Sequence, residues 1–212
     1  MEQKTKIAVL GGGGKTGKYL VTQLLSQGYY INLLLRNPEN FHLESPLLKI
    51  VKGDAIDPVA IHSLLLNCQA VISTVGQRKD EPLVASQATL NVLRAMKEYG
   101  IQRYILLAGL NVDTPFDKKG AETKHATEWM KMNFPLIHAD RQKAYSILSA
   151  SDVDWTLVRV PLIEFTDARG EIIANVDDCE GNKISAADIG HFLVDQLSDI
   201  TYIRKAPFIA NG

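Results

Sequence analysis

Cysteine is scarce in this sequence, which has only Cys68 and Cys179 among its 212 residues. The two are isolated, and neither belongs to a paired spacing. This excludes a disulfide framework and a cysteine-based metal or redox motif, so we expect buried or unreactive thiols. The five histidines are scattered too, and no two form a metal-binding pair at helical spacing. The sequence therefore predicts no metal site.

Long apolar runs and an excess of one charge are also absent. No run approaches the ~20 residues of a membrane span, and the formal net charge is -1. The opening segment from Met1 to Lys6 is polar and has no apolar core behind it, unlike a targeting signal. We therefore expect a cytoplasmic protein without a nucleic-acid or membrane partner, present as a monomer or a small homo-oligomer.

Short apolar runs alternate along the chain with segments of helical periodicity. The clearest helical segments are Leu83–Tyr99, which stops at Gly100, and Ala186–Leu197, with Ser185 as its N-cap. The nearly continuous Ile, Val and Leu runs are typical of parallel strands covered on both faces. These strand candidates are Ile7–Leu10, Tyr30–Leu35, Lys49–Val51, Ala70–Thr74, Arg103–Ala108 and Trp155–Arg159. The alternation predicts a three-layer α/β/α fold with a doubly wound parallel sheet, formed by residues 1–212 as one domain.

A glycine cluster lies between the first strand candidate and a helical segment. It fits a dinucleotide-binding turn in two registers, Gly12-x-Gly14-x-x-Gly17 and Gly11-x-x-Gly14-x-x-Gly17. Glycines permit positive φ and leave room for a pyrophosphate, whose charge is attracted by the free amides and dipole at the helix start. A P-loop is disfavoured, because Val9 stands where that motif needs a glycine. The alternative without a ligand is a flexible surface turn.

The end of the second strand candidate indicates which dinucleotide binds. Arg36 lies about twenty residues beyond the glycine turn, where this kind of fold places its ribose-reading side chain. An acidic residue there would hold the free 2′-hydroxyl of NAD, whereas a guanidinium offers a planar fork of donors to a 2′-phosphate. Arg36 therefore predicts NADP (NADPH) in preference to NAD, unless it is an ordinary solvated arginine.

Several segments together resemble the atypical short-chain dehydrogenase/reductases. Within that group the sequence is similar to the NmrA-like branch that contains biliverdin reductase B, also called flavin reductase. The resemblance covers nearly the whole chain from Lys6 onward. The matching segments are Gly11 to Gly17, Leu34-Leu35-Arg36-Asn37, Gly53-Asp54-x-x-Asp57, Ile72-Ser73-Thr74-Val75-Gly76, Asp154-Trp155-Thr156-Leu157-Val158-Arg159-Val160-Pro161 and Ile184-Ser185-Ala186-Ala187-Asp188-Ile189-Gly190.

The resemblance implies an NAD(P)-binding Rossmann-type domain and assigns cofactor residues by position. Arg36 would hold the 2′-phosphate, with Asp54 and Ala55 beside the adenine. The other implied residues are Gly11, Gly13, Gly14, Lys15, Thr16 and Gly17 at the pyrophosphate, Thr74, Val75 and Gly76 at the nicotinamide ribose, and Ala108, Gly109, Val160, Pro161 and Leu162 around the nicotinamide. Two structural alternatives remain: Gly53 and Gly76 as simple turns, and Asp54 as the cap of the next helix.

The sequence departs from the family where its chemistry would be expected. Ordinary short-chain dehydrogenases use a Tyr-x-x-x-Lys pair and a serine, but no tyrosine here has a lysine four residues later. Alignment places Ile137 at the tyrosine position and Arg141 at the lysine position, and the fifth strand candidate ends without a serine. The sequence shows no positioned acid to protonate an alkoxide. Arg141 and Tyr145, on one helix face, are the weak catalytic candidates, with a solvated arginine and a core-edge tyrosine as the alternative.

A flavin, quinone or tetrapyrrole-like acceptor demands less from the protein. Hydride transfer to such a flat aromatic system requires two rings held together and water excluded, after which solvent protonates the product. The sequence therefore predicts an NADPH-dependent reductase of such an acceptor. The competing hypothesis is an NmrA-like NADP-binding redox sensor with little or no turnover. A sugar-nucleotide epimerase is disfavoured, because the tyrosine and a substantial substrate lobe are missing.

Substrate specificity is expected in the C-terminal part, about residues 161–185. Phe165 could stack there on a flat ligand or belong to the core, and a short strand is expected over Glu171–Val176. Trp129, Met130 and Met132 could cover the site or pack against the sheet.

Overall fold

The protein is built around a twisted eight-stranded sheet with the strand order β3-β2-β1-β4-β5-β6-β10-β8. The computed structural model describes residues 5–77 and 83–212, so residues 1–4 of the polar opening segment lie outside it. Every neighbouring pair in the sheet is parallel except β10 and β8, and β7 and β9 form a separate parallel pair. The strands are β1 Lys6–Leu10, β2 Tyr30–Leu35, β3 Leu48–Lys52, β4 Ala70–Ser73, β5 Arg103–Gly109, β6 Asp154–Val160, β7 Leu162–Glu164, β8 Ile172–Asn175, β9 Lys183–Ser185 and β10 Phe208–Asn211.

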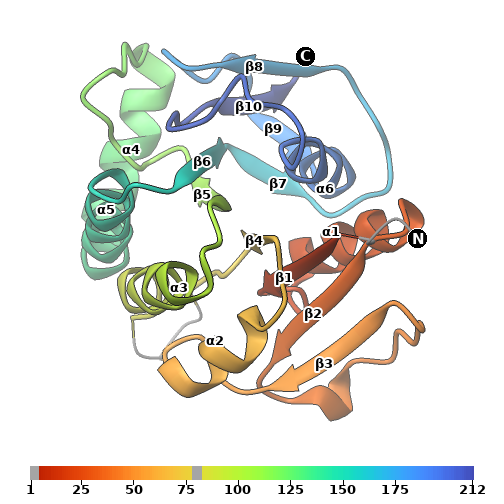
Figure 1. Ribbon diagram of the computed structural model, residues 1–212. Helices are drawn as coiled ribbons and strands as arrows, with labels where there is room; N and C mark the ends of the chain where they lie inside the picture. Colours follow the sequence, from red (N-terminus) through yellow and green to blue (C-terminus); the bar gives the residue numbers. More distant parts are fainter. Residues whose placement is uncertain (1–4, 78–82) are drawn as a thin grey trace.

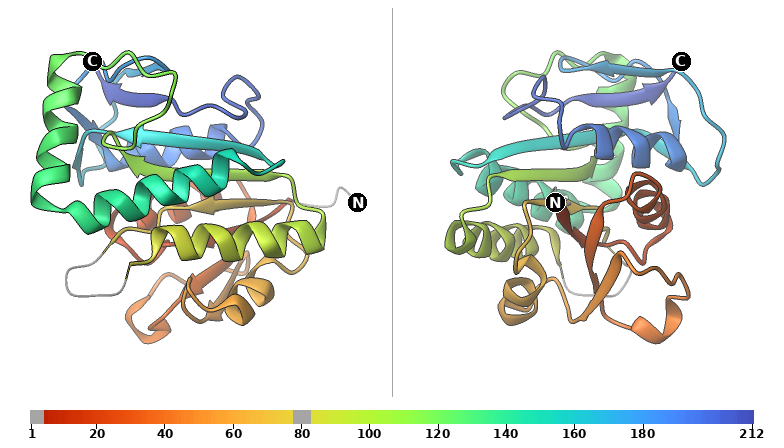
Figure 2. Two further views of the ribbon diagram at one scale, coloured as in Figure 1. Left: turned by 90° about the vertical axis from the view of Figure 1, so that its left-hand side faces the viewer. Right: turned by 45° about the vertical axis from the view of Figure 1, so that its right-hand side comes forward.

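Helices cover both faces of this sheet. Figure 1 shows α2, α3 and α5 along one side, with α4 beyond them, and α1 packed beside α6 on the other. The turned views of Figure 2 show the same three layers. The helices are α1 Lys15–Ser26, α2 Pro58–Leu65, α3 Ala85–Tyr99, α4 Ala121–Asn133, α5 Pro135–Ser149 and α6 Ala186–Asp195, and a 3₁₀ turn, η1, spans Pro38–Asn40. The predicted three-layer, doubly wound α/β fold is confirmed.

The central strands are apolar on both faces because each face is covered. Along β5, Tyr104 and Leu106 point into the core under α2, α3 and α5, whereas Ile105 points into the core under α1 and α6. Successive strand residues point to opposite sides of a sheet, so a nearly continuous apolar run supplies two cores at once.

The predicted elements are present with small shifts at their ends. Gly100 ends α3 with a left-handed φ of 68°, and the Ser185 hydroxyl caps α6 by accepting from the Asp188 amide at 3.0 Å. The helix predicted to run to Leu197 ends at Asp195, and the strand expected over Glu171–Val176 is β8, one residue shorter at each end. The antiparallel pairing of β8 with β10 was not predicted, because it depends on contacts between segments distant in the chain.

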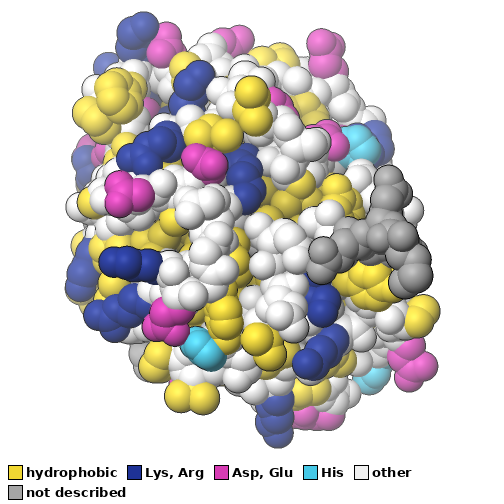
Figure 3. Space-filling model, viewed as in Figure 1, with side chains coloured by type: hydrophobic (Ala, Val, Ile, Leu, Met, Phe, Trp, Pro, Cys, Tyr) yellow, Lys and Arg dark blue, Asp and Glu magenta, His cyan; other side chains and the backbone are white. Residues whose placement is uncertain are grey.

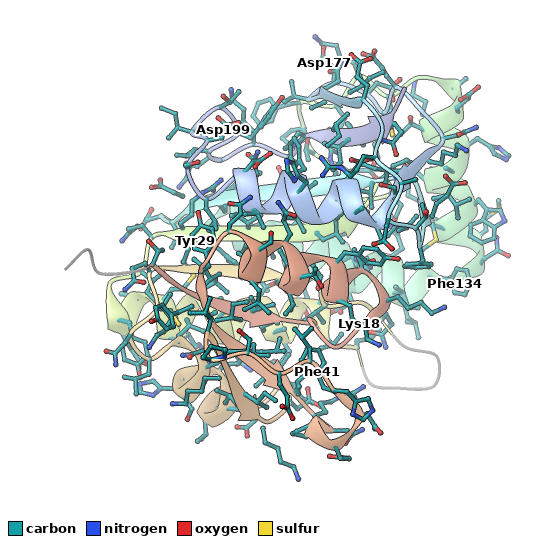
Figure 4. All side chains as sticks on the ribbon, turned by 90° about the vertical axis from the view of Figure 1, so that its right-hand side faces the viewer. Lys18, Tyr29, Phe41, Phe134, Asp177 and Asp199 are labelled. Carbon is teal, nitrogen blue, oxygen red and sulfur yellow. The ribbon has the colours of Figure 1, made fainter. Side chains whose placement is uncertain are left out.

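The strand order reverses between β1 and β4. From β1 the chain builds outward through β2 and β3, and then crosses back to β4 on the other side of β1 before continuing to β5 and β6. The carboxyl ends of these strands therefore frame a crevice, the usual ligand position in doubly wound sheets. Figure 4 shows the starts of α1, marked by Lys18, and of α5, marked by Phe134, at this edge, whereas Tyr29 marks the opposite edge.

Candidate cofactor and acceptor site

A large cleft opens at the carboxyl ends of the first four strands. Its volume of about 760 Å³ lies within the usual range for cofactor and ligand sites. Twelve of the predicted cofactor residues line it: Gly11, Gly13, Gly14, Lys15, Thr16, Gly17, Arg36, Asp54, Ala55, Thr74, Val75 and Gly76. Four separate strand ends thus bring together residues that are far apart in the chain. Gly11 and Gly76, the first and last of the twelve, are 65 positions apart (76 − 11).

The glycine turn has the geometry of the longer register, Gly11-x-x-Gly14-x-x-Gly17. Gly11 has a φ of +77°, and a Cβ there would lie 2.6 Å from the Thr74 carbonyl carbon on the neighbouring strand end. Gly14 is the N-cap of α1 and has no side chain that could accept a hydrogen bond. The first backbone amides of the helix therefore have no capping acceptor and are available to a ligand. Gly12 is excluded from the cleft lining, since a Cβ there would lie 2.4 Å from a Leu33 methyl in the core.

Arg36 lies in the same cleft, at the end of β2. Its Nη1 is 3.8 Å from the Asp54 carboxylate at the end of β3, and both side chains are 37% exposed. Asp54 does not cap the following helix: it accepts from the Ile56 amide, whereas Asp57 caps α2 by accepting from the Val59 amide. Asp54 is therefore able to take part in the polar lining around Arg36.

A second, smaller cavity adjoins the cleft. It has a volume of about 40 Å³ and lies between α3, α5 and the ends of β4 and β5. Val75, just beyond the end of β4, lines both spaces, so they lie next to each other. The small cavity brings together Ala108, Arg141 and Tyr145, three residues that the sequence associates with the nicotinamide and the acceptor.

Both candidate catalytic side chains on α5 are at least partly shielded from solvent. Burial raises the pKa of Tyr145, and its ring packs edge-on against Trp155 with 6.1 Å between centroids. Burial also lowers the pKa of Arg141, a shift that the charge of Asp140 only partly opposes. Arg141 is therefore partly shielded from solvent.

The loop after β5 is held by buried polar contacts next to this cavity. Arg159, which is fully buried, donates to the Asp117 carboxylate at 2.7 Å and to the Val112 carbonyl at 2.9 Å, and its guanidinium lies 3.5 Å from the Phe208 ring centroid. Gln142 on α5 donates to the Asp113 carbonyl at 2.8 Å. Val112 itself lines the small cavity, so these bonds hold one wall of it in place.

The rest of the predicted nicotinamide wall lies outside both spaces. Gly109, Val160, Pro161 and Leu162 line neither the cleft nor the small cavity. The Gly109 position is covered by Asn111, whose Oδ1 would lie 2.5 Å from a Cβ there, and Leu162 is 71% exposed. Of the residues predicted around the nicotinamide, Ala108, which precedes Gly109, is the one that lines a described cavity.

Several cleft residues were not predicted from the sequence. Asn37, Asn40 and Phe41 form the far rim, and Phe41 is labelled in Figure 4. Their position directly after Arg36 was the available signal. Phe165 lies on the opposite rim, half exposed, with the Lys15 ammonium 5.2 Å from its ring centroid. It is therefore not a core residue.

The segment with Trp129, Met130 and Met132, for which a cover over the site and packing against the sheet were both open, lies apart from the two cavities. Trp129 packs edge-on against Phe134 at the turn between α4 and α5, and Met132 is 72% exposed. Neither Trp129, Met130 nor Met132 lines the two cavities, and the exposure of Met132 also excludes packing of that side chain against the sheet.

Metal and thiol chemistry have no visible support in this structure. Residues 5–77 and 83–212 contain no cluster of three His, Cys, Asp or Glu side chains able to hold a metal ion. Burial raises the pKa of Cys68 to about 12 and that of Cys179 to about 11, so both remain thiols at neutral pH, as expected.

Across the same described ranges, no helix is both long and apolar enough to cross a membrane. Both signs of charge are scattered over the face shown in Figure 3.

Comparisons with known proteins give relatives in sequence and in fold. An uncharacterized chloroplastic protein of Arabidopsis thaliana is 25% identical over 183 residues, which cover 82% of this chain and 64% of that protein. A short-chain dehydrogenase/reductase from Veillonella parvula DSM 2008, solved in complex with NADP, superposes with a TM-score of 0.81 at 14% identity, covering 98% of this chain and 94% of that one.

A further structural neighbour is the anaerobillin reductase ChuY from Escherichia coli O157:H7. It superposes with a TM-score of 0.81 at 19% identity, covering 98% of this chain and 97% of that one. At these identities the two structures show a shared fold. The family model described as NAD(P)H-binding matches residues 11–200, from the glycine turn to the segment after α6. The chain therefore belongs to the NAD(P)H-binding family.

Proposed function

We propose that this protein is an NADPH-dependent reductase that transfers hydride to an oxidised, flat aromatic acceptor such as a flavin or a quinone. One observation carries the proposal: the cleft that contains the glycine turn and Arg36 shares the lining residue Val75 with a second cavity, which is lined by Arg141 and Tyr145. A dinucleotide and an acceptor thus have adjoining spaces. The names of the relatives, which include reductases, support the same class.

Arg36 is the basis for proposing NADPH rather than NADH. Its guanidinium lies in the cleft at the end of β2, where it could form a bidentate contact with a 2′-phosphate. The neighbouring Asp54 could accept from the adenine amino group. A bound NADP in a structural neighbour of similar fold supports a phosphorylated dinucleotide.

The residues of the glycine turn would hold the pyrophosphate. Backbone amides at the start of α1 offer donors together with the positive end of the helix dipole, and Lys15 adds a charge at the rim. Gly11 and Gly14 would let the diphosphate approach the backbone. Thr74, Val75 and Gly76 then direct the other end of the dinucleotide toward the small cavity.

When bound, the nicotinamide supplies the hydride, so the protein needs to position rings and exclude water. The apolar walls at Val75, Leu107 and Ala108 are suited to both tasks. Tyr145 keeps its proton at neutral pH because burial raises its pKa. A reduced flavin or hydroquinone takes its proton from solvent, which is consistent with the missing Tyr-x-x-x-Lys pair.

Steady-state assays test the proposal. NADPH oxidation is followed with FMN, menadione and a redox dye as acceptors, and NADH serves as the matched cofactor control. We expect turnover with at least one acceptor and a higher kcat/KM for NADPH than for NADH. Tight NADPH binding without turnover of any acceptor would contradict the reductase and favour the redox sensor.

A further inference from the structure

Arg141 is a partly buried cation that forms no ion pair within the described residues. Within the described residues its guanidinium takes part in no hydrogen bond or salt bridge, although it is only partly exposed at the wall of the small cavity. The other shielded arginines differ: Arg103 donates to the Gln196 and Asp154 carbonyls, and Arg159 donates to Asp117. A desolvated charge without a partner is unfavourable, so Arg141 is poised for an anion from outside.

The nearest carboxylate is already used. Asp140 precedes Arg141 on α5 and is buried, but its oxygens point across to the start of α3. They accept from the Ala85 amide at 2.8 Å and from the Ser86 hydroxyl and amide. Asp140 thus serves as the N-terminal cap that α3 lacks in its own sequence, and its charge offsets the desolvation of Arg141 only in part.

The cavity beside Arg141 is suited to a small polar group on an apolar body. Four of its lining residues, Ser73, Thr89, Tyr104 and Tyr145, carry hydroxyl groups, and most of the others are aliphatic. Its volume of about 40 Å³ exceeds the roughly 10–15 Å³ that one water molecule requires. A group held there would be attached to a ligand that reaches past Val75 into the cofactor cleft.

We propose that this cavity binds a carboxylate carried by the acceptor, with Arg141 as its counter-ion. This inference rests on the proposed function, because it adds a chemical requirement to the same acceptor site. A planar carboxylate matches the guanidinium fork with two parallel hydrogen bonds. A phosphate dianion is larger and more strongly hydrated, and the small, mostly apolar space has no second cation in its described lining to pair with it.

Binding can be measured without any turnover. Isothermal titration calorimetry of the protein, with and without saturating NADP⁺, uses 2-naphthoate as the probe. Naphthalene-2-carboxamide is the neutral probe of the same shape, and 2-naphthyl phosphate represents the other oxyanion. We expect 2-naphthoate to bind at least about 10-fold more tightly than the amide, in line with charge-assisted hydrogen bonds.

Two variants separate the charge of Arg141 from its bulk, and a third, at Arg94, is the control. Arg141→Met should lower 2-naphthoate affinity to that of the amide and leave amide affinity unchanged. Arg141→Lys should keep part of the preference, because it retains the charge but loses the fork. Arg94→Met removes an exposed arginine of α3 that lines neither cavity, and it should change nothing. The melting temperature of ligand-free Arg141→Met should stay the same or rise, since an unpaired cation is removed.

Equal binding of 2-naphthoate and its amide to the wild type would overturn the inference. So would tighter binding of 2-naphthyl phosphate, or an unchanged 2-naphthoate affinity in Arg141→Met. A melting temperature lowered in both Arg141→Met and Arg141→Lys would also overturn it, by showing that Arg141 has a structural partner. These results are independent of NADPH oxidation, so the reductase proposal can fail while the carboxylate site stands, and the reverse also holds.

Discussion

Arg36 and Asp54 face each other in the cleft, at the ends of β2 and β3, with 3.8 Å between Nη1 and the carboxylate oxygen. Both side chains are 37% exposed, so the pair is open to solvent and contributes little to stability. Its significance lies in ligand choice: a 2′-phosphate entering here would compete with Asp54 for the same guanidinium.

The first prediction concerns this pair. Arg36→Asp should weaken NADPH binding at least about 10-fold, because a like charge would face the 2′-phosphate, while NADH affinity changes by less than about 3-fold. Asp54→Asn should raise the ratio of NADPH to NADH affinity. Fluorescence titration with both nucleotides measures the two effects, and equal losses for NADPH and NADH in Arg36→Asp would remove the basis for cofactor choice.

The glycine turn allows packing and binding to be separated. A Cβ at Gly17 would lie 2.1 Å from the Gly11 carbonyl oxygen and 2.6 Å from the Gly12 Cα, both backbone atoms. Gly17→Ala should therefore lower the free energy of unfolding by about 2–3 kcal/mol, at the upper end of overpacking costs. Nothing lies within 4 Å of a Cβ at Gly76, so Gly76→Ala should change it by less than about 0.5 kcal/mol. Urea denaturation compares them, and similar stabilities for both variants would contradict the close backbone approach at Gly17.

The third prediction is a pH dependence of stability that depends on Asp188. Burial disfavours its charge, but hydrogen bonds from Asn211, Gly170, Ser185 and Arg169 outweigh burial, so the pKa of Asp188 is lowered. A carboxyl group whose pKa is lowered on folding stabilises the protein above its unfolded-state pKa of about 3.9, and this stabilisation is lost as the pH falls through the folded-state value.

Asp188→Asn should accordingly lower the free energy of unfolding near neutral pH by about 1–3 kcal/mol, less than for a fully buried ion pair because Arg169 is 47% exposed. The wild-type and variant curves should converge as the pH falls below about 4. Denaturation across that range measures this. A constant gap down to the most acid condition would show that packing, rather than charge, explains the loss.

The fourth prediction is a rate that needs no acid from the protein. Two of the titratable side chains of α5 keep one protonation state near neutrality: burial raises the pKa of Tyr145, and burial lowers the pKa of His138 below its ordinary 6.5. With a quinone acceptor, kcat should show no ionisation step between about pH 7 and 9. Tyr145→Phe should lower kcat by less than about 3-fold, because no proton transfer through its hydroxyl is required. A larger loss, with a new pH dependence, would identify Tyr145 as a proton donor.

Local patterns in the sequence were sufficient for most of the central fold and one half of the site. The apolar runs of β1 to β6 identify buried parallel strands because both faces of each strand need apolar cover. Gly11, Gly14, Gly17 and Arg36 could be placed in one cleft, because spacing from a strand end fixes position at the carboxyl edge of a parallel sheet.

Only the tertiary structure decided the surroundings of Arg141 in the other half of the site. Whether Arg141 is solvated or shielded depends on the packing of α5 against α3, and whether it is neutralised depends on Asp140 capping a helix 54 and 55 residues earlier in the chain. The pairing of β8 with β10 and the exposure of Met132 have the same origin. Spacing along the chain predicts local geometry, but desolvation and the choice of partner are set by segments that meet only in the folded protein.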